Sequence, residues 1–153
     1  MIASSKSNRY ERIHKQLQDL VSPDLPSASR MATIAALLYH KINYYFWTGF
    51  YLLSEDRLLV GPYQGSLACI ELPRGQGVCW EAIGRGETVI VPDVHQFPGH
   101  IACDSRSQSE IVVPLRDRSS TIYGVLDVDS DKLNSFDSVD REWLERIVLI
   151  LND

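Results

Sequence analysis

Long apolar runs and clustered basic residues are both missing from this sequence. The longest apolar run extends from Ile34 to Tyr39, far short of the ~20 residues that cross a bilayer as a helix. Fifteen Lys and Arg residues are scattered along the chain against twenty Asp and Glu, which gives a net charge of −5. Because nucleic-acid phosphates require clustered positive charge, we expect neither nucleic acid nor a membrane as a partner.

Several familiar catalytic motifs are also absent. The sequence contains no GxSxG serine elbow, no GxxxxGK[ST] phosphate loop and no HExxH zinc helix. It therefore gives no support to a hydrolytic or nucleotide-driven enzyme. His95, His100 and Cys103 are zinc-binding residue types, but their spacing matches no compact zinc pattern such as paired CxxC. We expect no metal.

Cysteine is scarce, because the chain has only Cys69, Cys79 and Cys103. Residues 1–12, MIASSKSNRYER, lack the apolar segment of a signal peptide. We therefore expect a cytoplasmic protein, in which a permanent disulfide framework would be unusual. Three cysteines allow three alternative bridges, and their spacing favours none of them. Each thiol is either a candidate for chemistry or a small core residue.

The hydrophobic pattern predicts an α+β fold. Helical spacing predicts two N-terminal helices within residues 8–43 and a C-terminal helix at 137–152 that Asp137 caps. Between them, β-branched and aromatic runs predict a central antiparallel sheet of about six strands, in one domain spanning residues 1–153. The apolar positions that define the helices are Tyr10, Ile13, Leu17, Leu20, Val21, Met31, Ile34, Ala35, Leu38, Leu144, Ile147, Val148 and Leu151.

The expected strands place the three cysteines in different settings. We expect a meander of NYYFWTGFYLL, RLLVGPYQG and LACIELP, followed by a short helix, GVCWEAIGRGE, and the strands TVIVP, SEIVVPLRD and TIYGVLDVD. Cys69 then lies in a strand and Cys79 near the start of the short helix. Cys103 lies in the long loop between Val91 and Leu115, and its polar surroundings favour a reactive thiol. A protonated His100 nearby would favour the thiolate.

Two acidic residues point in one direction near the end of the last strand. Asp127 and Asp129 are two positions apart, so both side chains project from the same face, about 7 Å apart. If Leu115 pairs with Ile122, Glu110 falls opposite Asp127 on that face. Such close carboxylates favour a cationic ligand group or a shared proton. The alternative is that the strand simply ends in solvent.

Two aromatic residues share a face of the first strand with a glycine. Trp47 and Tyr51 flank Gly49, which would leave an open floor between the rings. A slot of this kind suits an apolar or sulfur-bearing group. The same pattern also occurs in ordinary cores.

Four segments together resemble the free methionine-(R)-sulfoxide reductases, a family of stand-alone GAF domains. They are FWTGFYLL, GPYQGSLACIELPRGQGVC, VIVPDVHQFPGHIACDSRSQSEIVVPL and GVLDVDSDKLNSFDSVD, and the match runs from about Tyr44 to Asp140. The resemblance implies a thiol enzyme that reduces free L-methionine-(R)-S-oxide without a metal or organic cofactor. It implies that Cys103 is the nucleophile, Cys69 the main resolving thiol and Cys79 an auxiliary one.

The resemblance also implies a catalytic cycle and a binding mode. Cys103 would become a sulfenic acid and then a disulfide, which an external dithiol such as thioredoxin reduces. Glu110, Asp127 and Asp129 would hold the ammonium group of the free amino acid. One of the three, for which we favour Glu110, would also donate a proton to the sulfoxide oxygen. Trp47 and Tyr51 would line the thioether end, and backbone N–H groups of the long loop would hold the α-carboxylate.

One position departs from the family pattern, since Trp80 follows Cys79 where the family has glycine. The auxiliary role of Cys79 is therefore the weakest part of the resemblance. Two alternatives remain, a small-ligand-sensing GAF module without catalysis and a thiol redox switch or peroxidase that uses Cys103 and Cys69. A peroxide, however, has no ammonium group for three carboxylates to hold. By analogy with other GAF domains, we expect a homodimer.

Overall fold

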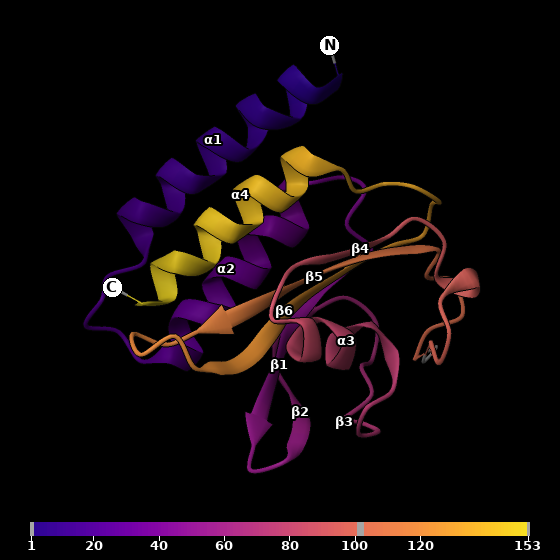
Figure 1. Cartoon of the computed structure of the whole chain (residues 1–153). Helices are drawn as coiled ribbons and strands as arrows, with labels where there is room; N and C mark the ends of the chain where they lie inside the picture. The colour runs from indigo at the N-terminus through magenta and orange to yellow at the C-terminus, as the bar shows by residue number, and fades with distance from the viewer. Residues whose placement is uncertain (1, 101–102, 153) are drawn as a thin grey trace.

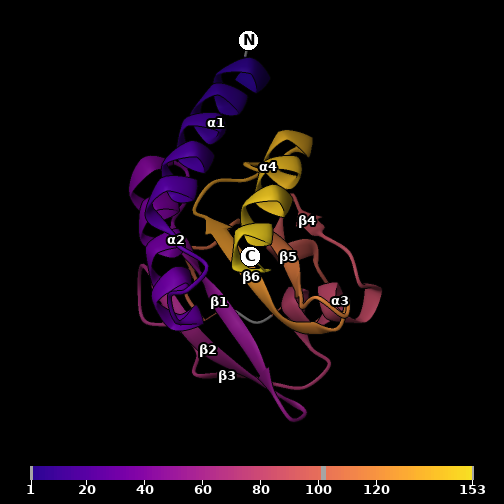
Figure 2. The same ribbon diagram turned by 90° about the vertical axis from the view of Figure 1, so that its left-hand side faces the viewer.

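A six-stranded antiparallel sheet forms the centre of the molecule, in a computed structural model that describes residues 2–100 and 103–152. The strand order is β3-β2-β1-β6-β5-β4. Helices α1, α2 and α4 cover one face of the sheet, and α3 lies on the other (Figures 1 and 2). The elements are α1 (Ile2–Leu20), α2 (Ser27–Lys41), β1 (Trp47–Ser54), β2 (Arg57–Gln64), β3 (Glu71–Leu72), α3 (Gly77–Arg85), β4 (Val89–Val91), η1 (Val94–Gln96), β5 (Ser109–Arg116), β6 (Ile122–Ser130), α4 (Ser138–Val148) and η2 (Leu149–Asn152).

The helices follow the apolar spacing, with small differences in extent. α1 begins at Ile2, earlier than expected, and Leu20, one of the apolar positions that indicated this helix, is 53% exposed. Asp137 caps α4 as predicted, because its side chain accepts hydrogen bonds from the N–H groups of Val139 and Asp140. Among the described residues, no helix is long and apolar enough to cross a membrane.

Alternation along β5 and β6 separates two hydrophobic clusters. Ile111, Val113 and Leu126 pack under the three long helices, whereas Val112 and Val125 pack on the side of α3. Successive side chains of a strand point to opposite faces. Glu110, Asp127 and Asp129 therefore project on the α3 side, away from the three-helix layer.

The pairing of β5 with β6 differs from the expected register by two residues. Leu115 pairs with Gly124, and Glu110 lies opposite Asp129, where Asp127 was expected. Arg116, and not Leu115, pairs with Ile122, and the register shifts between Leu115 and Arg116. The Asp117 carboxylate organises the turn that follows, because it accepts hydrogen bonds from the N–H groups of Ser119 and Thr121. An even shift keeps every side chain on its face, so the three acids still share one side.

Cys69 was wrongly expected in a strand. β3 is limited to Glu71–Leu72, and Cys69 lies in the preceding loop. Its neighbours Leu67 and Ile70 are 84% and 75% exposed, so the apolar alternation of LACIEL does not reflect burial. The Cys69 carbonyl accepts a hydrogen bond from the side-chain hydroxyl of Tyr51, where a carbonyl in a strand would accept one from a backbone N–H.

Candidate active site

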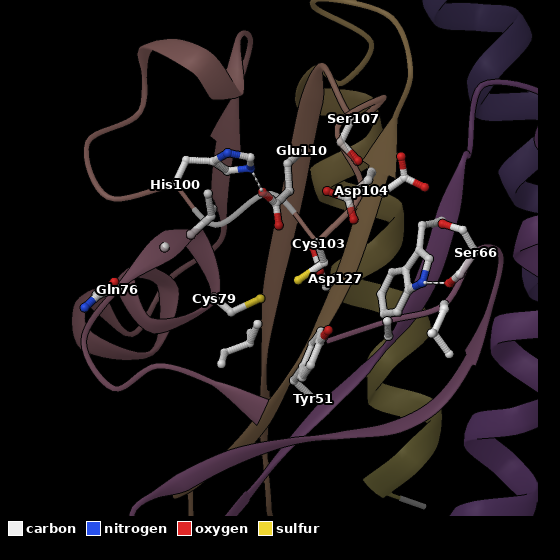
Figure 3. Close-up of a pocket in the computed structure, with 17 residues that line it drawn as sticks. Tyr51, Ser66, Gln76, Cys79, His100, Cys103, Asp104, Ser107, Glu110 and Asp127 are labelled. Atoms are coloured by element: carbon white, nitrogen blue, oxygen red, sulfur yellow. Dashed lines mark hydrogen bonds and ion pairs between the residues drawn. The ribbon is translucent and has the colours of Figure 1, made fainter. Parts of the chain in front are cut away.

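A pocket opens between the α3 side of the sheet, the start of α3 and two loops (Figure 3). Its empty space, including the part open to solvent, is about 590 Å³. β1, β5 and β6 supply its floor, and loop residues 66–68 together with 100, 103, 104 and 107 supply its rim. The lining residues are Trp47, Tyr51, Ser66, Leu67, Ala68, Leu72, Gln76, Gly77, Val78, Cys79, His100, Cys103, Asp104, Ser107, Glu110, Asp127 and Asp129.

A disulfide joins the two rim loops. It connects Cys69 with Cys103, whose Cα atoms are 5.6 Å apart. The bridge is the pairing that the family resemblance implied and that spacing alone left open. Cys103 is exposed and Cys69 is partly buried, so the bond lies within reach of an external reagent. The described form of the protein is therefore an oxidised one.

Glu110, Asp127 and Asp129, hereafter the acidic trio, lie on the pocket floor. Glu110 is 5% exposed and Asp127 is 6% exposed, while Asp129 is partly exposed. Among the described residues, Asp127 Oδ1 is buried without a hydrogen-bond partner. The alternative that these acids are simply solvated at a strand end is wrong for Glu110 and Asp127. A buried acceptor without a partner is costly unless a ligand supplies a donor.

Burial raises the pKa of each member of the acidic trio. Burial, and then the charges of Asp127 and Asp129, raise the pKa of Glu110 well above its usual range. Burial and Asp127 raise the pKa of Asp129 in the same way. Burial also raises the pKa of Asp127, but hydrogen bonding from Glu110 and then from Cys79 opposes that rise. Asp127 is thus the best place for a negative charge, and Glu110 is a protonated acid.

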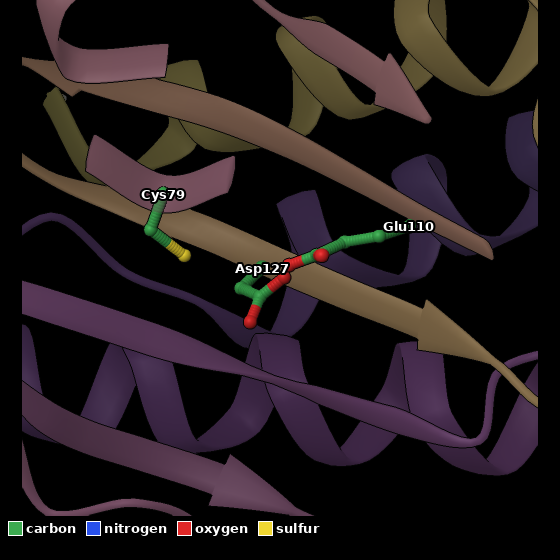
Figure 4. A group of neighbouring side chains, drawn as sticks. All are labelled: Cys79, Glu110 and Asp127. Carbon is green, nitrogen blue, oxygen red and sulfur yellow. The ribbon is translucent and has the colours of Figure 1, made fainter. Parts of the chain in front are cut away.

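Cys79, Glu110 and Asp127 form a close group at the inner end of the pocket (Figure 4). The Cys79 sulfur and one oxygen from each acid all lie within 4.8 Å of one another. These donor types also occur in cation sites. Burial raises the pKa of the Cys79 thiol, as it does that of Glu110, so a metal would have to displace both protons. We assign no metal to the group.

His100 does not act as the cation that the sequence suggested beside Cys103. Its Nε2 atom lies 4.0 Å from Glu110 Oε1. Burial, and then His95, lower the pKa of His100, so the ring is neutral at neutral pH. Asp104 lines the rim as an ion pair with Arg106, and the paired guanidinium holds the pKa of Asp104 well below its usual range.

Trp47 and Tyr51 both reach the pocket, but the slot expected between them does not exist. Their rings stack with centroids 5.8 Å apart, and Tyr63 stacks on Trp47 from the neighbouring strand. A Cβ on Gly49 would lie 2.7 Å from the Trp47 ring and 2.3 Å from Tyr63 Cβ. The glycine therefore allows close packing, and the aromatic residues form a wall and not a slot.

The start of α3 is a pocket feature that sequence reasoning missed. Gln76, Gly77 and Val78 line the pocket, and the side chain of the N-cap residue Gln76 forms no capping hydrogen bond. Uncapped N–H groups at a helix N-terminus favour anions. The lack of Ser, Thr, Asp or Asn at the N-cap was the available signal. The loop N–H groups expected to hold a carboxylate include residues 101–102, which lie outside the described residues.

Known proteins resemble this chain over nearly its full length. The GAF domain family matches residues 32–150. GAF domain-containing protein A of Dictyostelium discoideum is 45% identical over 150 residues, which are 97% of this chain and 94% of that protein. Free methionine-R-sulfoxide reductase of Escherichia coli is 40% identical over 144 residues, which are 94% of this chain and 87% of that enzyme.

A solved structure extends the similarity to three dimensions. The X-ray structure of free methionine-R-sulfoxide reductase from Neisseria meningitidis, in complex with its substrate, has a TM-score of 0.90. It is 41% identical, and the match covers 95% of this chain and 87% of that one. The chain therefore belongs to the GAF domains and, within them, to the free methionine-R-sulfoxide reductase family.

Proposed function

We propose that this protein reduces free L-methionine-(R)-S-oxide to L-methionine with a cysteine nucleophile. The observation that carries the proposal is the Cys69–Cys103 disulfide on the rim of a pocket that has the acidic trio on its floor. A thiol reductase needs such a bridge within reach of its substrate. Family membership and the shape of the matched fold support the same reaction.

The buried acids fit the ammonium group of a free amino acid. Asp127 has a buried oxygen that lacks a partner among the described residues, and an ammonium group supplies the missing donor and charge. The uncapped N–H groups at the start of α3 receive the α-carboxylate. Trp47 and Tyr51 face the thioether end of the substrate. A peptide-bound methionine lacks this ammonium group, so the pocket selects the free amino acid.

The reduced enzyme carries out the chemistry in two steps. The Cys103 thiolate attacks the sulfoxide sulfur, Glu110 gives its proton to the sulfoxide oxygen, and the S–O bond breaks. The oxygen leaves as hydroxide, and the Cys103 sulfur is then bonded to the substrate sulfur. Hydroxide attacks the Cys103 sulfur, the S–S bond breaks, and methionine leaves with the bonding electron pair. The substrate has gained two electrons, and Cys103 has lost two and become a sulfenic acid. The Cys69 thiol then attacks the sulfenic sulfur, water leaves, and the disulfide forms.

An external dithiol must return the enzyme to its reduced form, because nothing in the reaction regenerates the thiols. We propose thioredoxin, which reduces disulfides by exchange through a mixed disulfide. The reaction as written uses no cofactor of the protein's own. A cytoplasmic location and a homodimer stay predictions.

The test is release of methionine from separate R and S isomers of free methionine sulfoxide, with thioredoxin and its reductase as the electron source. We expect turnover of the R isomer alone, and none in Cys103→Ser. Cys69→Ser should release about one methionine per site and then stop, because its sulfenic acid is not resolved. If neither isomer is reduced while both bind, the protein is a sensing module and the proposal is wrong.

A further inference from the structure

Cys79 is the thiol that the disulfide leaves out. It lies in the first turn of α3 and is only 3% exposed. Burial is the main cause that raises the pKa of its thiol, and the charges of Asp127 and Glu110 add to it. A buried thiol that keeps its proton is a poor nucleophile and a poor resolving group. The auxiliary resolving role that the family resemblance implied therefore does not suit this environment.

The Cys79 sulfur is directed at the acids (Figure 4). It lies within 4.8 Å of one oxygen of Glu110 and one of Asp127. Hydrogen bonding from this thiol lowers the pKa of Asp127, next to the larger contribution of Glu110. An un-ionised thiol is a hydrogen-bond donor, although a weak one. Asp127 thus has two neutral donors directed at it.

The other titratable groups described around Asp127 supply no positive charge. The pKa of Tyr51 is raised by burial and that of His100 is lowered by burial, so both are neutral at neutral pH. Asp129 is a further acid. These groups lie on β1, on the loop before β5 and on β6. Until the substrate's ammonium group arrives, donors such as Cys79 are the means of keeping Asp127 ionised.

We propose that Cys79 is a positioning residue whose thiol donates a hydrogen bond to Asp127, so that the negative charge stays on Asp127 and the transferable proton stays on Glu110. The proposal rests on the proposed function and adds a role to its site. Trp80 fits this role, because its indole N–H donates to the Leu72 carbonyl and fixes the turn that carries Cys79.

The test compares Cys79→Ser, which keeps a donor, with Cys79→Ala and Cys79→Val, which do not. We expect the two non-donor variants to raise KM for free methionine-(R)-S-oxide by about 5- to 10-fold with little change in kcat. The acidic limb of their kcat/KM profile should move to higher pH, because losing a hydrogen bond to the charged form raises the pKa of Asp127. Cys79→Ser should recover most of both changes.

Two outcomes would overturn this role. If serine and alanine alike allow one methionine per site but stop thioredoxin-supported turnover, Cys79 is a resolving thiol. If alanine and valine match the wild type in KM and in the acidic limb, Cys79 only fills space. Should the alanine variant fold poorly, valine against serine decides the question. Failure of the proposed function itself would be distinct, since the wild type would then release no methionine.

Discussion

Buried carboxylates form two clusters on opposite faces of the sheet, and the two clusters differ in how fully their oxygens are hydrogen-bonded. Asp140, at the start of α4, is fully buried and accepts hydrogen bonds from Lys6, Tyr10, Tyr44 and the Asp137 N–H. The acidic trio, by contrast, has an Asp127 oxygen without a partner among the described residues, and the pKa of its Glu110 is raised. One cluster is complete without a ligand, and the other is not.

The difference separates a structural acid from a functional one. The Asp140 cluster, defined as Lys6, Tyr10, Tyr44 and Asp140, joins α1 and the segment before β1 to α4, so its hydrogen bonds stabilise the helical layer. The acidic trio places three acids close together, so that ionising more than one of them costs free energy. Sites that bind charged ligands commonly carry such a cost. The two clusters should therefore respond in opposite directions to neutralisation.

The largest effect is expected from Asp140→Ala. It leaves Lys6, whose side chain is 14% exposed, without its main partner, and breaking a buried ion pair costs about 3–5 kcal/mol. Urea denaturation should show this loss in the free energy of unfolding. Glu142→Ala on the same helix is the control, since it removes an exposed pair worth at most about 1 kcal/mol. Equal, small decreases in the free energy of unfolding of both variants would contradict a structural role for Asp140.

The next effect is expected from Asp127→Asn, in binding and not in folding. Losing a charge-assisted hydrogen bond to ammonium costs about 1.5–3 kcal/mol, so KM for free methionine-(R)-S-oxide should rise about 10- to 100-fold. The matched control is Asp140→Asn, which should leave KM within about twofold. Steady-state kinetics on both variants makes the measurement. An unchanged KM in Asp127→Asn would show that the trio does not bind the ammonium group.

A smaller effect is expected from Glu110→Gln on stability at neutral pH. The variant removes an acid whose pKa is raised by burial and by its neighbours, so the folded state no longer has to retain that proton. We expect the free energy of unfolding to rise by about 1 kcal/mol, while activity falls. Denaturation at pH 7 tests this. A destabilised Glu110→Gln would mean that Glu110 is as structural as Asp140.

The raised pKa of Glu110 also predicts how the free energy of unfolding changes with pH. A carboxyl whose pKa is raised in the folded state holds its proton after the unfolded chain has lost it, so stability falls as pH rises above about 4. Glu110 and Asp129 both have raised pKa values. The free energy of unfolding should therefore decrease from pH 5 to pH 8, and less steeply in Glu110→Gln. Identical slopes would contradict the assignment of a proton to Glu110.

The sequence predicted which face of the sheet carries the acidic trio better than it predicted the pairing register of β5 and β6. Period-two alternation placed Asp127, Asp129 and Glu110 on one face, and the two-residue error in pairing preserved that result. The error arose because Arg116 is the partner of Ile122 and because the register shifts between Leu115 and Arg116, an irregularity that apolar alternation does not reveal. In LACIEL, the alternation of apolar residues predicted a strand that included Cys69. That prediction was wrong, and the apolar side chain of Ile70 in the same segment is exposed.

Features that depend on distant contacts could not be predicted from local pattern. The stacking of Trp47 on Tyr63 needs the β1–β2 pairing to be known. The neutral state of His100 follows from its burial and from the nearby His95, neither of which sequence spacing reveals. The buried environment of Cys79 likewise arises only when α3 packs against β5 and β6. The family resemblance supplied the pairing of Cys69 with Cys103, which spacing alone left open.

The central claim is that the acidic trio makes this pocket specific for a free amino acid. The most direct test is the ratio of kcat/KM for free methionine-(R)-S-oxide to that for its N-acetyl derivative, which has no ammonium group. We predict a ratio of about 100 or more in the wild type, and a much smaller ratio in Asp127→Asn. Equal kcat/KM values for the two substrates in the wild type would contradict the claim.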